Sequence, residues 1–459
     1  FRCLEIIESY SPASANFKKH VTRKLARLEK LSGLSFGDPE KPLLLSVRSG
    51  SSISQPGMLD SFLNVGLNEQ ITRSLARITK NPWFAWDCYR RFLQGYGMAF
   101  GINRDAFDGI INSYKKSYSV EFKRHFTGVQ MEEVALAYRS LLIDSGVTLI
   151  QSPMDQLFLA ISKVFASWNS RRARDFRRIM GISDDWGTAV TVQSMVFGNR
   201  SRQSGSGVVF SHSPRLPGDT VRLWGDFTIG NQGEDVVSGL VKTLPVSEMQ
   251  RKLEERDTKI SLESRFPEVY KALKQIVHKL IFEQRWTPQE FEFTFEGPEE
   301  KDLYILQARE MSLRERKVIL NFDADDETLD SAYLGQGIGV SGGAMSGRIV
   351  FTLQEIDKFR KTSPDSFLIL LRNDTVPDDI LEIDAADGLL TARGGLTSHA
   401  AVVAYNLEKT CVVGCENLLC SEEEKSCTLN GVSMTTGDYI SINGQRGSVF
   451  QGKMAVKKM

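Results

Sequence analysis

The sequence has little of what marks several protein classes. It holds only six cysteines in 459 residues, too few for a disulfide scaffold, so we expect reduced thiols in a cytosol-like compartment. Its 57 Lys and Arg residues balance 57 Asp and Glu, which leaves no general attraction to nucleic acid or to an anionic membrane. No apolar run approaches the length of a membrane span, and no secretory leader is visible. We therefore predict two or three domains, with neither a nucleic acid nor a membrane as partner.

Two local features that resemble binding motifs are better explained as ordinary structure. Four cysteines lie close together, but three, four and six residues separate them, unlike the close pairs of zinc sites; they are Cys411, Cys415, Cys420 and Cys427. We expect buried or incidental thiols. The basic segment "SWNSRRARDFRRIMG" lies in a chain without net positive charge, so a solvated helix face is the preferred interpretation.

The order of patterns along the chain predicts a mixed α/β (α+β) protein. "PLLLSVRSG" is typical of a buried strand that runs into a loop, and residues 70–185 have mostly helical spacing. From residue 187 short β-rich runs alternate with Gly and Ser, and "QEFEFTFEG" and "DLYILQARE" are expected to pair as a hairpin. A polar, acidic stretch follows Arg309 and precedes a last compact domain of short strands with a helix after His399.

The segment "TARGGLTSHAAVV", residues 391–403, places a lone histidine after two glycines and two hydroxyl residues. The glycines permit a tight turn, Thr397 or Ser398 is suited to cap a helix, and His399 would occupy its first turn. Free N–H groups and the helix dipole there favour an anion and a neutral imidazole, which can attack phosphorus. The alternative is a polar helix-start residue without a chemical role. The residues expected to hold a phosphoryl group are Arg393, Gly394, Gly395 and Ser398.

The predicted hairpin carries four polar residues at alternating positions. Glu290 and Glu292 are two apart on one strand, and Gln307 and Arg309 repeat that spacing on the next, so each pair shares one face. Two carboxylates, an amide and a guanidinium would form a platform for a metal and a triphosphate. A solvated sheet face is the equally weighted alternative.

Two earlier features also suit a triphosphate. Arg48 lies where a strand meets a loop, so its guanidinium can reach phosphate oxygens. Gly205 and Gly207 in "QSGSGVVF" would allow a backbone lid over phosphates, although most such Gly/Ser segments are hairpin turns.

Beyond these physical patterns, "TARGGLTSHAAVVA", "GIGVSGGAMSGRIVF" and "GDYISINGQRGSVFQG" resemble the phosphohistidine domain of the enzymes that interconvert pyruvate and phosphoenolpyruvate (PEP). "PLLLSVRSGSSISQPGMLDSFLNVGLN", "GTAVTVQSMVFGN" and "GDFTIGNQGEDVVSG" are similar to the ATP-grasp domain of the same PEP-utilising family, and the last is closest in form to its pyruvate phosphate dikinase branch. The resemblance implies an ATP-grasp domain in 1–310 with a helical insertion at about 70–185, a linker in 311–335, and a swivelling β/α phosphohistidine domain in 336–459.

The resemblance also implies roles for individual residues. His399 would be phosphorylated by ATP in a dikinase reaction, and Thr397 matches a position of regulatory phosphorylation. The positions that match the ATP site are Arg48, Asp226, Glu290, Glu292, Gln307 and Arg309. Mg²⁺ would bind through Glu292 and Gln307. Glu290 is typically aspartate in the family and Asp226 typically glutamate, which are departures of this chain.

The family further implies ATP, inorganic phosphate and pyruvate or PEP as small-molecule partners, with a homodimer as the assembly to consider. We expect a cytoplasmic location, with plastid or glycosome as alternatives. The family's N-terminal lysine segment and C-terminal β/α barrel have no match in this sequence, so we expect a fragment, a split subunit or a shortened relative. Two other functions stay open: a PEP synthase-like dikinase that uses water as phosphoryl acceptor, and a non-catalytic phosphocarrier or nucleotide sensor.

Overall fold

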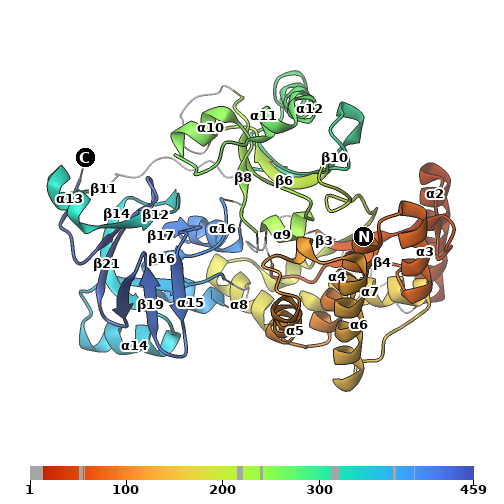
Figure 1. Cartoon of the computed structure of the whole chain (residues 1–459), viewed down its shortest axis with the longest axis horizontal. Helices are drawn as coiled ribbons and strands as arrows, with labels where there is room; N and C mark the ends of the chain where they lie inside the picture. Colours follow the sequence, from red (N-terminus) through yellow and green to blue (C-terminus); the bar gives the residue numbers. More distant parts are fainter. Residues whose placement is uncertain are drawn as a thin grey trace. The chain divides into compact units, whose positions relative to one another are not determined.

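A computed structural model describes residues 14–50, 55, 57–213, 221–237, 241–311, 320–375, 379–396 and 398–458. The described residues form two compact units that divide between Met195 and Val196, and Figure 1 labels the elements of both. Helices and several sheets alternate along the chain, which confirms the predicted mixed α/β class. Among the described residues, no helix is long and apolar enough to span a membrane.

The first unit consists of a small sheet and a group of helices. Its three-stranded antiparallel sheet has the order β4-β3-β5, formed by Phe62–Val65, Leu45–Gly50 and Ala189–Ser194. The short strands β1 (Ser35–Phe36) and β2 (Pro42–Leu43) pair beside it. The long helices are α2 (Ala15–Ser32), α3 (Glu69–Thr79), α4 (Pro82–Ala99), α5 (Arg104–Ser117), α6 (Gly128–Asp144), α7 (Pro153–Ser167) and α8 (Arg171–Met180), with 3₁₀ turns at Lys123–His125 and Asp184–Trp186. Helices therefore occupy most of the stretch expected to be a helical insertion.

Local sequence signals explain where these helices begin. Asn81 caps α4 by accepting the N–H of Phe84, and Pro82 occupies the first turn, where its missing N–H costs nothing. Thr127 and Gln130 form a reciprocal capping box at the start of α6. The basic segment folds as α8, but Arg177 is only 1 % exposed; it donates to the carbonyl of Trp168. One arginine of the predicted solvated face is therefore a core residue.

The second unit begins with a five-stranded antiparallel sheet of order β10-β9-β6-β7-β8. Its strands are β6 (Gly205–Phe210), β7 (Trp224–Ile229), β8 (Leu244–Pro245), β9 (Gln289–Phe295) and β10 (Leu303–Glu310). Phe227, Phe291 and Phe293 point into an apolar core that α12 (Pro267–His278) covers. The remaining short elements are α9 (Gly233–Val237), α10 (Glu248–Leu253), α11 (Leu262–Arg265), a π-helical turn at Lys279–Glu283 and a 3₁₀ turn at Glu300–Asp302.

This sheet corrects the proposed glycine lid. Gly205 and Gly207 lie in β6, a strand hydrogen-bonded on both sides to β7 and β9. A Cβ on Gly205 would lie 2.3 Å from the carbonyl oxygen of Thr228, and one on Gly207 would lie 2.7 Å from the ring of Phe293. These glycines therefore admit aromatic rings and neighbouring backbone into a central strand, and the hypothesis that they form a loop over phosphates is wrong.

The second unit continues with an eight-stranded mixed sheet of order β12-β22-β21-β14-β15-β16-β17-β13. β14 to β17 run parallel, and the outer strands pair antiparallel. The strands are β12 (Tyr333–Gln336), β13 (Ile338–Ser341), β14 (Ala344–Val350), β15 (Leu368–Arg372), β16 (Gly388–Thr391), β17 (Thr410–Val413), β21 (Tyr439–Asn443) and β22 (Ser448–Gln451). The helices are α13 (Asp326–Ala332), α14 (Leu353–Thr362), α15 (Ile380–Ala385) and α16 (His399–Asn406).

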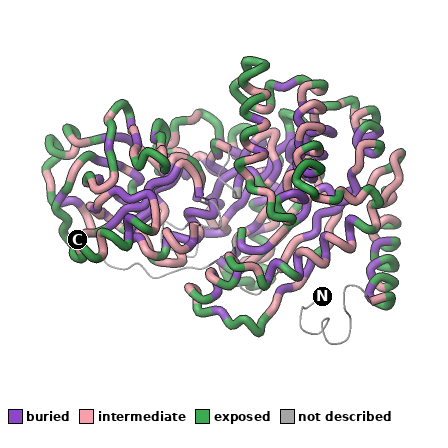
Figure 2. The backbone as a smooth tube through the Cα atoms, turned by 90° about the horizontal axis from the view of Figure 1, so that it is seen from below, coloured by how far each residue is buried: buried purple, intermediate pink, exposed green. Residues whose placement is uncertain are grey.

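Two smaller sheets complete this part of the chain. β18 (Leu418–Ser421), β19 (Ser426–Leu429) and β20 (Val432–Thr435) form an antiparallel meander, and β11 (Leu320–Phe322) pairs with β23 (Val456–Lys458). Figure 2 marks the strands of the large sheet as mostly buried. Cys411, Cys415 and Cys427 are buried, as expected, and Cys420 is partly buried.

The predicted division into domains at 310 and 336 stays a prediction. Residues 312–319 of the expected linker lie outside the described residues. The rest of it contains β11, α13 and the start of β12, and both strands pair within this unit. Residues 320–335 are therefore part of the folded body around the large sheet.

Candidate active site around His399

His399 is the first residue of α16, and Ser398 is its N-cap. Ser398 has an extended backbone (φ −67°, ψ 157°), and its Oγ accepts the N–H of Ala401 at 3.4 Å. The same hydroxyl donates to the carbonyl of Gly395 at 2.8 Å, which ties the helix start to the preceding loop. Only 4 % of His399 is exposed. The predicted capped helix with histidine in its first turn is confirmed, while Thr397 lies outside the described residues.

The loop before the helix requires both of its glycines. Gly394 has φ +109°, in the region that favours glycine, and a Cβ there would lie 2.8 Å from Oγ of Ser398. Gly395 is needed for space, because a Cβ there would lie 2.5 Å from Oδ2 of Asp226. Arg393 has a side chain 60 % exposed, with Nη1 3.6 Å from Oδ2 of Asp374. Its role in holding phosphate stays a prediction.

Asp226, on β7, contacts this loop directly. Its Oδ2 accepts the backbone N–H of Leu396 at 2.7 Å, and its Oδ1 accepts from Thr243 at 3.2 Å and from Nη2 of Arg256 at 2.8 Å. Asp226 is fully buried. Burial raises the pKa of its carboxyl, and the neighbouring Arg256 opposes that rise. In this arrangement both carboxylate oxygens accept hydrogen bonds from protein groups, and the predicted contact of Asp226 with ATP stays a prediction.

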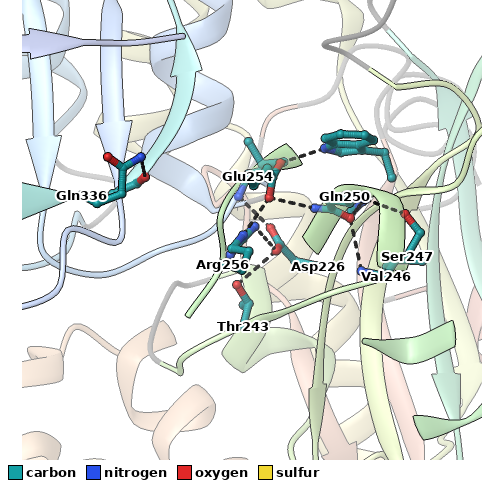
Figure 3. Close-up of polar contacts among 12 residues, drawn as sticks. Asp226, Thr243, Val246, Ser247, Gln250, Glu254, Arg256 and Gln336 are labelled. Carbon is teal, nitrogen blue, oxygen red and sulfur yellow. Dashed lines mark hydrogen bonds and ion pairs between the residues drawn. The ribbon is translucent and has the colours of Figure 1, made fainter. Parts of the chain in front are cut away.

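A second layer of polar residues surrounds Asp226 (Figure 3). Glu254 accepts from Nε1 of Trp224 at 2.9 Å and from Nε of Arg256 at 2.7 Å. Gln250, on α10, donates to Glu254 at 3.2 Å and accepts the N–H of Gly225 at 3.1 Å. No pattern in the sequence indicates this network, because its residues on β7, on α10 and just after α10 have no regular spacing. The one local signal is the Ser247 cap that begins α10.

The platform that the hairpin pattern predicts forms from Glu290, Glu292, Gln307 and Arg309. β9 and β10 pair antiparallel, with Arg309 opposite Glu290 and Gln307 opposite Glu292. Nη2 of Arg309 binds Oε1 of Glu292, and its Nε lies 3.4 Å from Oε1 of Glu290. Burial raises the pKa of Glu290, Arg309 opposes this effect, and the charge of Glu292 adds to it. These charged side chains are 13–26 % exposed, so this is a half-buried charged cluster and not a freely solvated face.

The platform suits Mg²⁺ bound together with phosphate oxygens. Mg²⁺ prefers oxygen ligands and usually takes one or two carboxylates with the rest from water and phosphate. Among the described residues, no group of three or more His, Cys, Asp or Glu is arranged to hold a metal alone. The facing carboxylate and amide of Glu292 and Gln307 fit the smaller protein share of such a site.

Arg48 is the remaining predicted nucleotide residue. It lies on β3 of the first unit, opposite Thr191 of β5, at the point where the strand changes from buried to half-buried residues. Arg48 is the fourth of the six residues of β3, and Ser49 and Gly50 continue the pairing with β5, so the prediction that it lies where a strand meets a loop is wrong. Its participation with the platform of the second unit stays a prediction.

The described residues thus combine the two features of a nucleotide-dependent phosphohistidine protein. A polar β-hairpin platform suits a metal-bound triphosphate, and a sheet domain holds a histidine at the start of a helix. Comparison with known families agrees. Residues 9–263 match the model of the pyruvate phosphate dikinase AMP/ATP-binding domain, and residues 365–447 match the mobile domain of PEP-utilising enzymes.

Among curated proteins, the chain is similar to pyruvate, phosphate dikinase of Clostridium symbiosum, with 34 % identity over 99 % of the chain and 54 % of the relative. The enzyme of the same name from Giardia intestinalis is 36 % identical over 98 % of the chain and 53 % of its own length. A chloroplastic one from Mesembryanthemum crystallinum is 36 % identical over 98 % and 49 %. The chain spans about half the length of these relatives, and it belongs to the pyruvate phosphate dikinase family.

Proposed function

We propose that this chain provides the nucleotide-binding and phosphohistidine parts of a pyruvate phosphate dikinase, in which ATP, phosphate and pyruvate yield AMP, diphosphate and PEP. The observation that carries the proposal is His399 at the capped start of α16, within the stretch that matches the mobile domain. The resemblance to dikinases along nearly the whole chain supports ATP as the donor.

In the first half-reaction, a nitrogen of His399 attacks the β-phosphorus of ATP. The bond between that phosphorus and the oxygen bridging to the α-phosphate breaks, and AMP leaves. Inorganic phosphate then takes the outer phosphoryl group as diphosphate, so that one phosphoryl group stays on His399. Transfer of that phosphoryl group to pyruvate would need a second site besides the one around His399.

The chain's own residues have three tasks in this reaction. The start of α16 offers first-turn N–H groups to the phosphoryl oxygens. Arg309 and Arg48 neutralise phosphate charge, and Arg393 supports the attached group. Glu292 and Gln307 would hold Mg²⁺, which would supply positive charge against the phosphates of ATP.

The proposal is tested by incubating the protein with ATP radiolabelled on the β-phosphate, Mg²⁺ and phosphate. We expect an acid-labile, base-stable label that His399→Ala abolishes. His278→Ala is the matched control, because His278 is an exposed histidine of α12 whose ring is tilted against that of Phe282; this variant should keep the label. A folded protein that takes no label would refute kinase activity of this chain and favour a phosphocarrier or nucleotide sensor.

The phosphoryl acceptor is identified by the product. Diphosphate formed in the presence of inorganic phosphate supports the dikinase that uses phosphate, and orthophosphate formed from water supports a PEP synthase-like reaction. Dimer formation and a cytoplasmic location stay predictions; one relative carries the word chloroplastic in its name.

A further inference from the structure

The two oxygens of the Asp226 carboxylate have different partners. Oδ1 is bound by Arg256 and Thr243, which Figure 3 shows beside Asp226. Oδ2 receives the N–H of Leu396, from the loop that leads into α16. The carboxylate can serve as a fixed acceptor for the loop only while its other oxygen is held in place.

Arg256 binds both Asp226 and a second buried carboxylate, Glu254. Its Nη2 binds Asp226 and its Nε binds Glu254, and the Asp226 and Glu254 side chains are 0 % and 1 % exposed. Two anions this deeply buried repel each other strongly unless a cation lies between them. Without Arg256, Asp226 would take up a proton or rotate away from its present orientation.

The loop at Gly395 and Leu396 allows the Asp226 carboxylate to approach its backbone closely. Gly395 leaves room for Oδ2, since a Cβ there would lie 2.5 Å from that atom. Its carbonyl accepts from the Ser398 hydroxyl that caps α16. A shift of Asp226 therefore reaches the helix start through one hydrogen bond to Leu396 and one from Ser398.

We infer that Arg256 is a positioning residue for His399: it orients Asp226 so that the carboxylate holds the Gly395–Leu396 loop and the start of α16. The contact stands on the geometry alone, whereas its effect on phosphorylation rests on the proposed function. Arg256 lies 143 residues before His399 in the sequence. A lysine would be a poor substitute, because one ammonium group does not reproduce the two-armed guanidinium fork.

The first test measures hydrogen exchange of the Leu396 amide in the full chain. Arg256→Met should speed this exchange at least tenfold. Arg251→Met is the matched control: Arg251 lies on nearby α10, pairs with Glu248 at 2.9 Å and donates to the carbonyl of Thr258, so it should leave the amide unchanged. A variant that unfolds would speed exchange across all core strands, which separates misfolding from local release.

The second test is a double-mutant cycle on the rate of His399 phosphorylation. Arg256→Met and Gly395→Ala should each slow phosphorylation at least tenfold, the first by releasing Asp226 and the second by blocking its approach. Their combination should be little slower than either alone, because both break the same contact. A merely structural arginine would give effects that multiply.

Unchanged Leu396 exchange in Arg256→Met, or full multiplication of the two rate effects, would overturn the inference. If the unmodified protein is not phosphorylated at all, the proposed function fails, and the exchange measurement still decides whether Arg256 holds the loop.

Discussion

The carboxylate of Asp226 accepts the backbone N–H of Leu396 at 2.7 Å, although 170 residues separate them in the sequence. This hydrogen bond joins a strand of the five-stranded sheet to the loop that precedes His399. Because we propose that His399 also serves a second site, the contacts between its loop and this sheet must be able to break and re-form. The carboxylate–amide bond of Asp226 with Leu396 and the exposed ion pair of Lys242 with Glu416 are contacts of this kind.

Replacing the N-cap of α16 should damage both the helix and the proposed chemistry. Ser398→Ala removes the acceptor for the Ala401 N–H and the donor to Gly395, which should lower the free energy of unfolding by about 1 kcal/mol. It should also slow His399 phosphorylation. Ser398→Thr retains the hydroxyl and should recover most of both losses. Thermal unfolding and β-phosphate labelling measure the two effects, and equal behaviour of the two variants would contradict the capping role.

Gly394 should tolerate no side chain. Gly394→Ala places a Cβ at φ +109° and 2.8 Å from Oγ of Ser398, and we expect it to cost about 1–3 kcal/mol of stability. Gly109→Ala is the control, because Gly109 lies within α5 with no atom near its would-be Cβ; it should be neutral or stabilise by up to about 1 kcal/mol. Urea unfolding of both variants provides the comparison, and equal stability changes would argue against a strained loop.

Arg309 should contribute more to the binding of ATP than to the stability of the fold. Arg309→Met leaves the carboxylates of Glu290 and Glu292 without their shared cation and removes a charged phosphate donor. We expect ATP affinity to fall roughly tenfold to hundredfold, as for the loss of one charged hydrogen bond. Titration calorimetry with ATP and Mg²⁺ measures the change. The exposed, unrelated Arg171→Met serves as control, and an unaltered affinity in Arg309→Met would remove this residue from the ATP site.

Glu290 should make the stability of the protein pH-dependent in a defined direction. Its pKa is raised by burial, so the folded state favours the protonated form more than the unfolded state does. The resulting cost is absent below the ordinary carboxyl pKa and grows as pH rises from there through the raised pKa of the folded state. Glu290→Gln carries no such cost, so the free energy of unfolding of this variant should rise relative to that of the unaltered protein as pH increases. Urea unfolding between pH 4.5 and 7 tests this. A difference in unfolding free energy that shrinks as pH rises would show that Arg309 affects the pKa of Glu290 more than burial does.

What the sequence determined by itself is local. The cap and glycines around His399 lie within six residues of one another, and the alternation of Glu290 with Glu292 and of Gln307 with Arg309 is set by strand geometry. Both sites could be predicted because helix starts and hairpins depend on near neighbours. The tertiary structure decided the rest. Gly205 and Gly207 proved to be packing positions because β6 is a central strand, and Arg256 lies between two carboxylates from different elements only in the folded chain. No spacing in the sequence predicts that these three charged side chains come together, because burial and charge pairing across long loops depend on how the sheets and helices pack.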